Sequence, residues 1–286
     1  MTEFLQSFMP TVASEMGHLG DNLNGLVHWL MLFLFVGWGT FFIYVLIRFR
    51  GSNNPKASYH GITNHYSSYV EVGVVVLEAL LLIGFAIPGY YAVKYDKVAD
   101  TSSDEIEVRI IAQQFAWNIH YPGADGKFGT TRINLVDEET NPIGLDREGY
   151  GADDITTINQ LHLPVNKMIK LYISSKDVIH GFSLPEMRLK QDAVPGMQVP
   201  IYFTPTMTSA EFLKEIKGTP RDGYMDINGK PHGGGYEIAC AQLCGNSHFK
   251  MRGFMTIHTE DEYNNWLNEE AEYLDSEGED DWDDEW

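Results

Sequence analysis

Four residues with soft metal-binding side chains lie close together near the end of the chain. Two cysteines, a histidine and a methionine fall within twelve residues, at Cys240, Cys244, His248 and Met251. These cysteines are the only two in the 286-residue sequence. Thiolate, imidazole and thioether groups together are typical copper ligands. His180 lies sixty residues upstream and could complete such a site from a neighbouring loop.

The two cysteines could form a disulfide or belong to one of several kinds of metal site. A disulfide between them would leave His248 and Met251 without a role. A zinc site that includes His180 would have little use for a thioether, and a single blue-copper centre uses only one thiolate. Because each of two thiolates can bridge two metal ions, the pattern favours a binuclear copper site. Such a pair shares one valence electron, relays electrons with little change in bond length, and has no open position for a substrate.

Two long apolar segments lie in the N-terminal third of the chain. Residues 26–47 contain no Asp, Glu, Lys or Arg, and a bilayer core is crossed by about 20 apolar residues. Residues 69–93 form the second segment, interrupted by Glu71 and Glu78. A cleaved signal peptide would be shorter and followed by small residues, whereas Arg48 follows the first segment. We therefore expect a two-helix transmembrane hairpin rather than buried helices of a soluble protein.

The charges beside these segments predict their orientation. The connector at 48–68 carries Arg48, Arg50 and Lys56 and no acidic residue, which places it in the cytoplasm by the positive-inside rule. Residues 1–25 carry acidic residues and no Lys or Arg. We therefore expect residues 1–25, and everything after residue 93, on the extracytoplasmic (periplasmic) face of a bacterial inner membrane.

The pattern of the chain changes to that of β-strands after the second apolar segment. Apolar and polar residues alternate in several runs between 106 and 173, separated by turn-forming Pro and Gly residues. This predicts an all-β domain over 105–260, either a sandwich or a barrel. The alternation lapses at about 205–235, where we expect an insertion with a short helix capped by Ser209.

The last part of the chain, 261–286, is strongly acidic. From Glu260 onward there are fourteen acidic residues and no basic ones, out of a net charge of −20 for the whole chain. So much charge predicts a disordered tail. The tail either keeps the protein soluble or attracts a basic protein partner by long-range electrostatics. The same sign of charge excludes nucleic acid as a partner.

Together these features resemble subunit II of the haem–copper cytochrome c oxidases, over nearly all of 26–266. In that family two transmembrane helices precede a cupredoxin-like sandwich. The copper motif of the family is matched in order and spacing by Cys240, Gln242, Cys244, His248 and Met251, with His180 upstream. The resemblance implies that His180 and Met251 complete one copper position. His248 and the backbone carbonyl of Gln242 would complete the other, with both cysteines bridging.

The sequence departs from the family pattern in two places. Gln242 stands where the family usually has a glutamate that helps bind magnesium between subunits, and an uncharged amide puts that magnesium site in doubt. The family also has Trp-aromatic-Trp after a glutamine, whereas this chain has Gln114-Phe-Ala-Trp117. Aligned without a gap, Phe115 takes the position where electrons enter, and Trp117 takes that of the second tryptophan. Trp117 can equally be read as a side chain that fills the domain.

Glu71 resembles a family glutamate at the mouth of a proton path into subunit I. It lies at the inner end of the second apolar segment, and a carboxylate inside a membrane is costly enough to suggest a function. The alternative is that its side chain reaches the nearby membrane surface and has no role in proton transfer.

The resemblance implies an electron-receiving subunit with no catalytic residue of its own. It would take single electrons from a soluble c-type cytochrome or similar donor and pass them to haem in subunit I. That subunit, with subunit III as a further partner, would reduce oxygen to water and transport protons. Two alternatives remain open: the copper subunit of a nitric-oxide-reducing relative, and a membrane copper chaperone.

Overall fold

The computed structural model describes residues 9–56, 59–60, 64–94, 105–217 and 235–280. The chain forms two compact units. One contains two long apolar helices, and the other is a β domain that also includes the short segment Pro10–His18.

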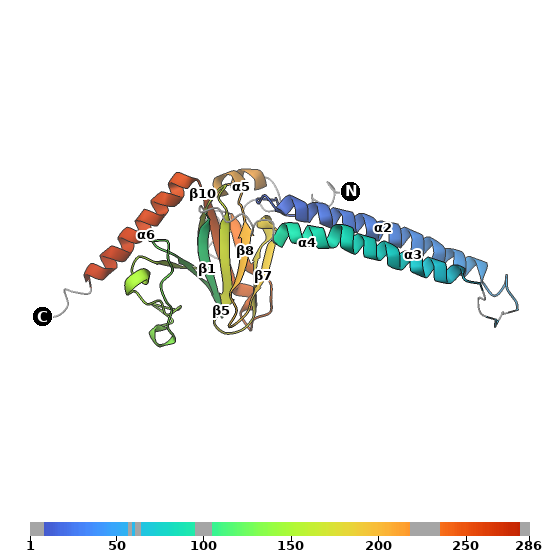
Figure 1. The fold of residues 1–286 in the computed structure, drawn as a ribbon, viewed down its shortest axis with the longest axis horizontal. Coiled ribbons are helices and arrows are strands. Elements are labelled where there is room, and N and C mark those ends of the chain that lie inside the picture. Colours follow the sequence, from blue (N-terminus) through green and yellow to red (C-terminus); the bar gives the residue numbers. More distant parts are fainter. Residues whose placement is uncertain (1–8, 57–58, 61–63, 95–104, 218–234, 281–286) are drawn as a thin grey trace. The chain divides into compact units, whose positions relative to one another are not determined.

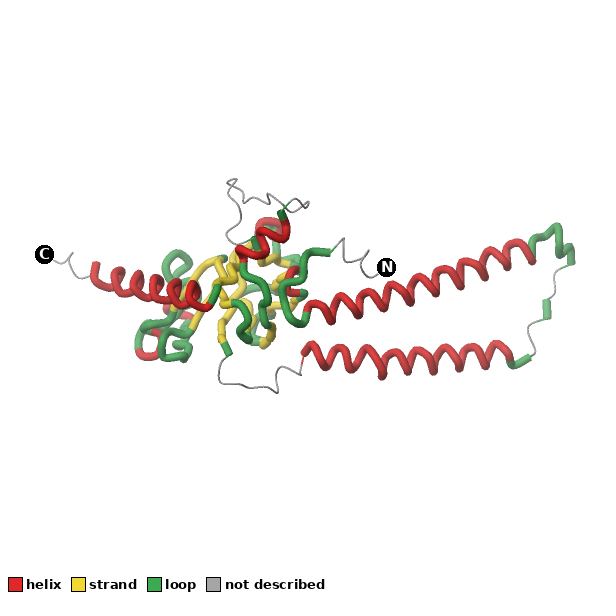
Figure 2. The backbone as a smooth tube through the Cα atoms, turned by 90° about the horizontal axis from the view of Figure 1, so that it is seen from above, coloured by secondary structure: helices red, strands yellow, loops and turns green. Residues whose placement is uncertain are grey.

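The helical unit contains the two predicted membrane-spanning segments. The first helix, α2, runs over Gly17–Arg48, and the second runs through α3 (Tyr66–Leu81), a π-helical turn (Leu82–Ala86) and α4 (Ile87–Lys94). Both views show the two helices running beside one another (Figures 1 and 2). No residue in their apolar windows is buried, as expected for helices that face lipid. The π-helical turn lies just before Pro88, whose backbone nitrogen carries no hydrogen and therefore cannot donate a helical hydrogen bond.

The β domain is a sandwich of two five-stranded sheets within the described residues. The first sheet has the order β3 (Ile155–Ile158), β2 (Ala116–Tyr121), β1 (Ile106–Gln113), β5 (Ile169–Ser175) and β8 (Val199–Phe203). The second has the order β4 (Gln160–Pro164), β10 (Arg252–His258), β9 (Tyr236–Cys240), β6 (His180–Leu184) and β7 (Leu189–Ala193). The predicted β-sandwich is confirmed.

Alternating side chains explain why these segments form a sandwich. Along β1 the residues Val108, Ile110 and Ala112 are completely buried, and their neighbours are not. The same alternation in β5 supplies a second row of buried residues, since β1 and β5 pair in parallel with Ile110 opposite Ile173. Each sheet therefore turns one apolar face to the other, and the core lies between them.

A short segment before the first helix is part of the β domain. Ala13 and Ser14 are completely buried there. The Ala13 N–H donates to the Glu186 carbonyl at 2.9 Å, and the Ser14 hydroxyl donates to the Met187 carbonyl at 2.8 Å. The segment thus joins the sandwich by hydrogen bonds that the sequence pattern did not predict.

The short helix expected in the insertion is present as α5 (Ser209–Ile216). Its N-cap is Thr208 rather than the predicted Ser209. The Thr208 side chain accepts from the Glu211 N–H, and the Glu211 carboxylate accepts from the Thr208 N–H, which completes a capping box. Residues 218–234 of the insertion lie outside the described residues.

The prediction of a disordered tail is wrong for the first twenty residues of that segment, because the helix α6 runs over Glu260–Asp280. The start of α6 is stabilised by Thr259, whose hydroxyl and N–H both donate to Glu262 at 2.9 Å, and by acidic residues in the first turn. Trp266 stacks on His162 of β4 with ring centroids 4.3 Å apart. Apolar residues at helical spacing therefore hold this acidic segment on the sandwich.

Replacing Trp266 with alanine should loosen α6 from the β domain. Removal of this partly buried ring takes away its stacking on His162 and its contact with Tyr121, whose ring centroid lies 5.1 Å away. We expect the free energy of unfolding to fall by about 3 kcal/mol, measured by urea titration of the purified chain. The exposed Glu269→Ala on the same helix should stay within about 0.5 kcal/mol of the native value. Equal stability of the two variants would show that α6 is not docked.

Candidate metal centre

Two neighbouring strands of the second sheet bring the metal-binding residues together. β6 begins at His180 and β9 ends at Cys240, and the two strands pair with Phe182 opposite Cys240. The loop after β9 is held against β6 because the Ala241 N–H donates to the Gly181 carbonyl at 2.8 Å. A side chain at position 181 would lie 3.0 Å from the loop backbone, so this close approach needs glycine.

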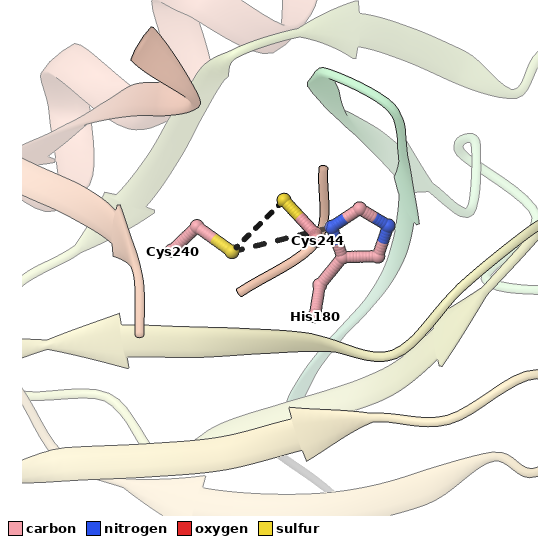
Figure 3. A group of neighbouring side chains, drawn as sticks. All are labelled: His180, Cys240 and Cys244. Carbon is pink, nitrogen blue, oxygen red and sulfur yellow. Dashed lines mark hydrogen bonds between the residues drawn. The ribbon is translucent and has the colours of Figure 1, made fainter. Parts of the chain in front are cut away.

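The two cysteines face one another as free thiols. Their Sγ atoms lie 3.8 Å apart, well beyond a disulfide bond of about 2.05 Å. The His180 Nδ1 atom lies 4.0 Å from the Cys240 sulfur. Figure 3 shows these three side chains pointing toward one another. Their ligand atoms all lie within 4.8 Å of each other.

The other predicted ligands lie around the same pair of sulfurs. The Met251 sulfur is 3.1 Å from His180 Nδ1 and 3.7 Å from the Cys244 sulfur. His248 Nδ1 is 3.5 Å from the Cys244 sulfur, and the Gln242 carbonyl oxygen is 3.2 Å from the Cys240 sulfur. The structure thus brings all six predicted ligand positions together.

This donor set fits soft metal ions. A thiolate–metal bond is about 2.3 Å long, so two sulfurs 3.8 Å apart can both contact one ion. The site also needs positive charge. Burial, together with the neighbouring Cys240 sulfur, raises the pKa of Cys244 to about 11. Two thiolates in this buried position are therefore unfavourable unless cations accompany them.

Asp177 orients the histidine at the start of β6. His180 is completely buried, and its Nε2 atom lies 2.8 Å from the Asp177 carboxylate. A proton on Nε2 leaves the lone pair on Nδ1, the atom that faces the sulfurs. Burial raises the pKa of Asp177, but hydrogen bonds from His180 and from two backbone N–H groups outweigh it and lower the pKa overall. The sequence reasoning gave Asp177 no role, although its position three residues before His180 was a signal.

The remaining predicted site residues have different surroundings. Phe115 is partly buried, and its ring packs against the cysteine loop at Gly245. Trp117 is completely buried, with its ring centroid 6.2 Å from that of His180. Trp117 therefore belongs to the core beneath the site, and Phe115 lies beside the loop. Glu71 lies in α3 of the helical unit and is exposed there.

Comparison with known proteins gives a consistent set of similarities. The family described as "Cytochrome C oxidase subunit II, periplasmic domain" matches residues 106–214. The chain is 30% identical over 264 residues to the alternative cytochrome c oxidase subunit 2 of Bradyrhizobium diazoefficiens, covering 92% of this chain and 83% of that protein. It is 26% identical over 247 residues to cytochrome c oxidase subunit 2 of Cyanidium caldarium, covering 83% and 79%.

A solved structure is also similar. It is the periplasmic domain of subunit II of cytochrome oxidase from Bradyrhizobium japonicum, at 22% identity and a TM-score of 0.38. The match covers 60% of this chain and 98% of that domain.

Asp177 should strengthen metal binding through His180. The substitution Asp177→Ala removes the acceptor that holds His180 Nε2, so we expect the affinity for copper to fall by about 10- to 100-fold. The measurement is a competition titration of the purified chain against a copper chelator. The isosteric Asp177→Asn keeps an acceptor oxygen and should lose less affinity. Native affinity in Asp177→Ala would rule out this orienting role.

Proposed function

This chain belongs to the cytochrome c oxidase subunit II family, and we propose that it carries the binuclear copper centre at which a haem–copper terminal oxidase receives electrons. As a subunit II it works together with other oxidase subunits. In this proposal a soluble c-type cytochrome or similar donor delivers single electrons to the copper centre, and the centre passes them to haem in the catalytic subunit I. Oxygen would then be reduced to water there, coupled to proton transport.

The arrangement of the two sulfurs carries the proposal. They lie 3.8 Å apart, with Met251 beside His180 and the Gln242 carbonyl and His248 beside different sulfurs. In this proposal His180 and Met251 would complete one copper position, and His248 and the Gln242 carbonyl would complete the other. A single metal ion would leave part of this set unused. Two copper ions bridged by the thiolates would share one valence electron and would gain or lose it with little change in bond length.

The chain shields three of the six proposed ligand residues from water, whereas Cys240 and His248 are partly exposed and Gln242 is exposed. His180 is 0% exposed, Met251 is 2% and Cys244 is 4%. Ligands that are shielded in this way do not have to rearrange with the solvent when the charge of the centre changes. This property supports a relay of electrons and gives no position for a substrate.

An apolar rim around the centre suits contact with an electron donor. Leu243 and Phe249 of the ligand loop are 78% and 73% exposed, and Val178 and Ile179 just before His180 are also exposed. Phe115 lies beside the same loop at Gly245. We therefore propose that electrons enter on this side, near Phe115, and that Trp117 supports the centre from the core.

The role of Gln242 limits the proposed cofactors to copper. Its backbone carbonyl lies 3.2 Å from the Cys240 sulfur, while its neutral side chain is exposed. The carboxylate with which the family binds magnesium is absent at this position. The proposal therefore includes two copper ions and does not include magnesium at the subunit interface.

The two long apolar helices support a membrane location. They are long and apolar enough to span a bilayer, and the β domain matches the periplasmic domain of the family. We propose that the connector between them is cytoplasmic, since it carries Arg48, Arg50 and Lys56 without acidic residues. Glu71 then lies near the cytoplasmic end of α3, where a carboxylate can receive protons for subunit I.

Electron spin resonance of the copper-loaded full chain tests the binuclear centre. We expect a seven-line pattern, because one unpaired electron couples equally to two copper nuclei of spin three-halves. Cys244→Ser should collapse the pattern, since it removes one bridging sulfur. Met251→Leu should change the line spacing, whereas Met255→Leu, a buried methionine of β10 outside the centre, should not. A four-line spectrum of one copper in the native chain would overturn the proposal.

A separate experiment tests the proton role of Glu71. In the assembled oxidase, Glu71→Gln should slow steady-state turnover, because an amide cannot take up protons, and it should leave the rate of copper reduction unchanged. Glu78→Gln, two turns along the same helix, is the matched control and should turn over at the native rate. Native turnover in Glu71→Gln would remove the proton path from the proposal.

A further inference from the structure

Gln114, in the turn between β1 and β2, makes hydrogen bonds to two different parts of the metal centre. Its backbone N–H donates to the Asp177 carboxylate at 2.7 Å. Its side-chain amide donates to the Cys244 carbonyl at 2.5 Å. The residue belongs to the first sheet, whereas the ligands come from the second sheet and its loops.

The first of these bonds reaches the histidine ligand. Asp177 accepts from Gln114 through Oδ2, and its other oxygen, Oδ1, lies 2.8 Å from His180 Nε2. Bonds to a carboxylate are stronger than neutral ones. The backbone of Gln114 thus fixes the carboxylate that fixes the His180 ring.

The second bond reaches the ligand loop, and close packing supports it. Gly245, next to Cys244, has a φ of +136°, a region that favours glycine. A side-chain carbon at Gly245 would lie 2.7 Å from the Gln114 amide nitrogen and 3.1 Å from the Phe115 ring. The loop therefore contacts Gln114 and Phe115 directly at the residue that follows a bridging cysteine.

We propose that Gln114 is a positioning residue that holds the Cys244 side of the copper centre in register with the His180 side. The proposal rests on the binuclear copper centre proposed above. Gln114 binds no metal itself. It links the loop that carries the thiolates to the carboxylate that orients the histidine, so that both ligand groups keep one relative position.

This link has an electrostatic consequence for the redox potential. The amide of Gln114 places the positive end of its dipole against the Cys244 carbonyl. Without it, the positive end of this dipole is missing beside the ligand loop, which favours the more positive, oxidised state of the centre. Loss of the amide should therefore lower the midpoint potential, and a carboxylate at position 114 should lower it further.

The neighbouring Gln113 offers a matched control. Its side chain accepts from Asn118 and Lys176 and donates to Glu138, so its bonds run along the first sheet and its covering loop. A change at Gln113 removes an amide of the same size one residue away. It leaves both Gln114 bonds in place.

The test uses the full chain loaded with copper. Gln114→Met keeps the length of the side chain without a donor, and Gln114→Glu keeps its shape with an acceptor only. Both variants retain the backbone N–H. We expect a changed line spacing in the electron spin resonance spectrum, a lower midpoint potential and about 10-fold faster loss of copper to a chelator. Gln113→Met should match the native chain in all three.

A double-mutant cycle tests the link itself. If Gln114 holds both sides, Gln114→Met combined with Asp177→Ala should accelerate copper loss by less than the product of the single effects. Gln114→Met removes the bond to Cys244 and Asp177→Ala removes the bond to the Gln114 N–H, so either change alone already breaks the link between the loop and the histidine. Native spectrum, potential and copper loss in both Gln114 variants, or strictly multiplicative effects in the cycle, would overturn the inference. A native chain without the seven-line spectrum would instead overturn the proposed copper centre.

Discussion

The rest of this structure depends on two sulfur atoms held 3.8 Å apart, of which the Cys244 sulfur is buried and the Cys240 sulfur partly exposed. As thiolates they would repel one another, and burial of Cys244 reduces the screening of this repulsion by water. Burial and the neighbouring sulfur both raise the pKa of Cys244, which measures this cost. The backbone must therefore hold the pair in place, and two thiolates here would need cations to neutralise them. A β-sandwich can meet the first need because paired strands fix their ends on both sides of the loop.

The two sheets divide this work between them. The second sheet supplies the ligands directly, through the pairing of β6 with β9 and the return of the chain into β10. The first sheet acts through hydrogen bonds, since Gln114 reaches both Asp177 and the Cys244 carbonyl. The centre thus sits at one end of the sandwich and is held from both layers. In the proposed electron relay, such a frame would help the ligands keep their positions, because hydrogen bonds from both layers hold them.

Much of this architecture could be predicted from local patterns. The spacing from Cys240 to Met251 has a direct chemical meaning, and long apolar runs and strand alternation are properties of short segments. The contacts of Gln114 were not predictable, because they join residues 63 and 130 positions apart through backbone atoms. The helix α6 was missed for another reason. Most of its residues are charged or polar, which suggested disorder. Its packing on the sandwich comes from a few residues at helical spacing, Tyr263, Trp266 and Leu267.

The ligand loop has to shield the metal-binding atoms from water and also to leave a surface that a partner protein can reach. Its donor atoms point inward, where Cys244 and Met251 are almost completely buried, while Leu243 and Phe249 beside them point outward. Electron-transfer complexes have small and weak interfaces, because the partners must separate after each transfer. In the proposed function, a few exposed apolar side chains would be enough for such a contact and would bring a donor close to the centre. The alternation of inward and outward residues in one short loop therefore gives both insulation and access.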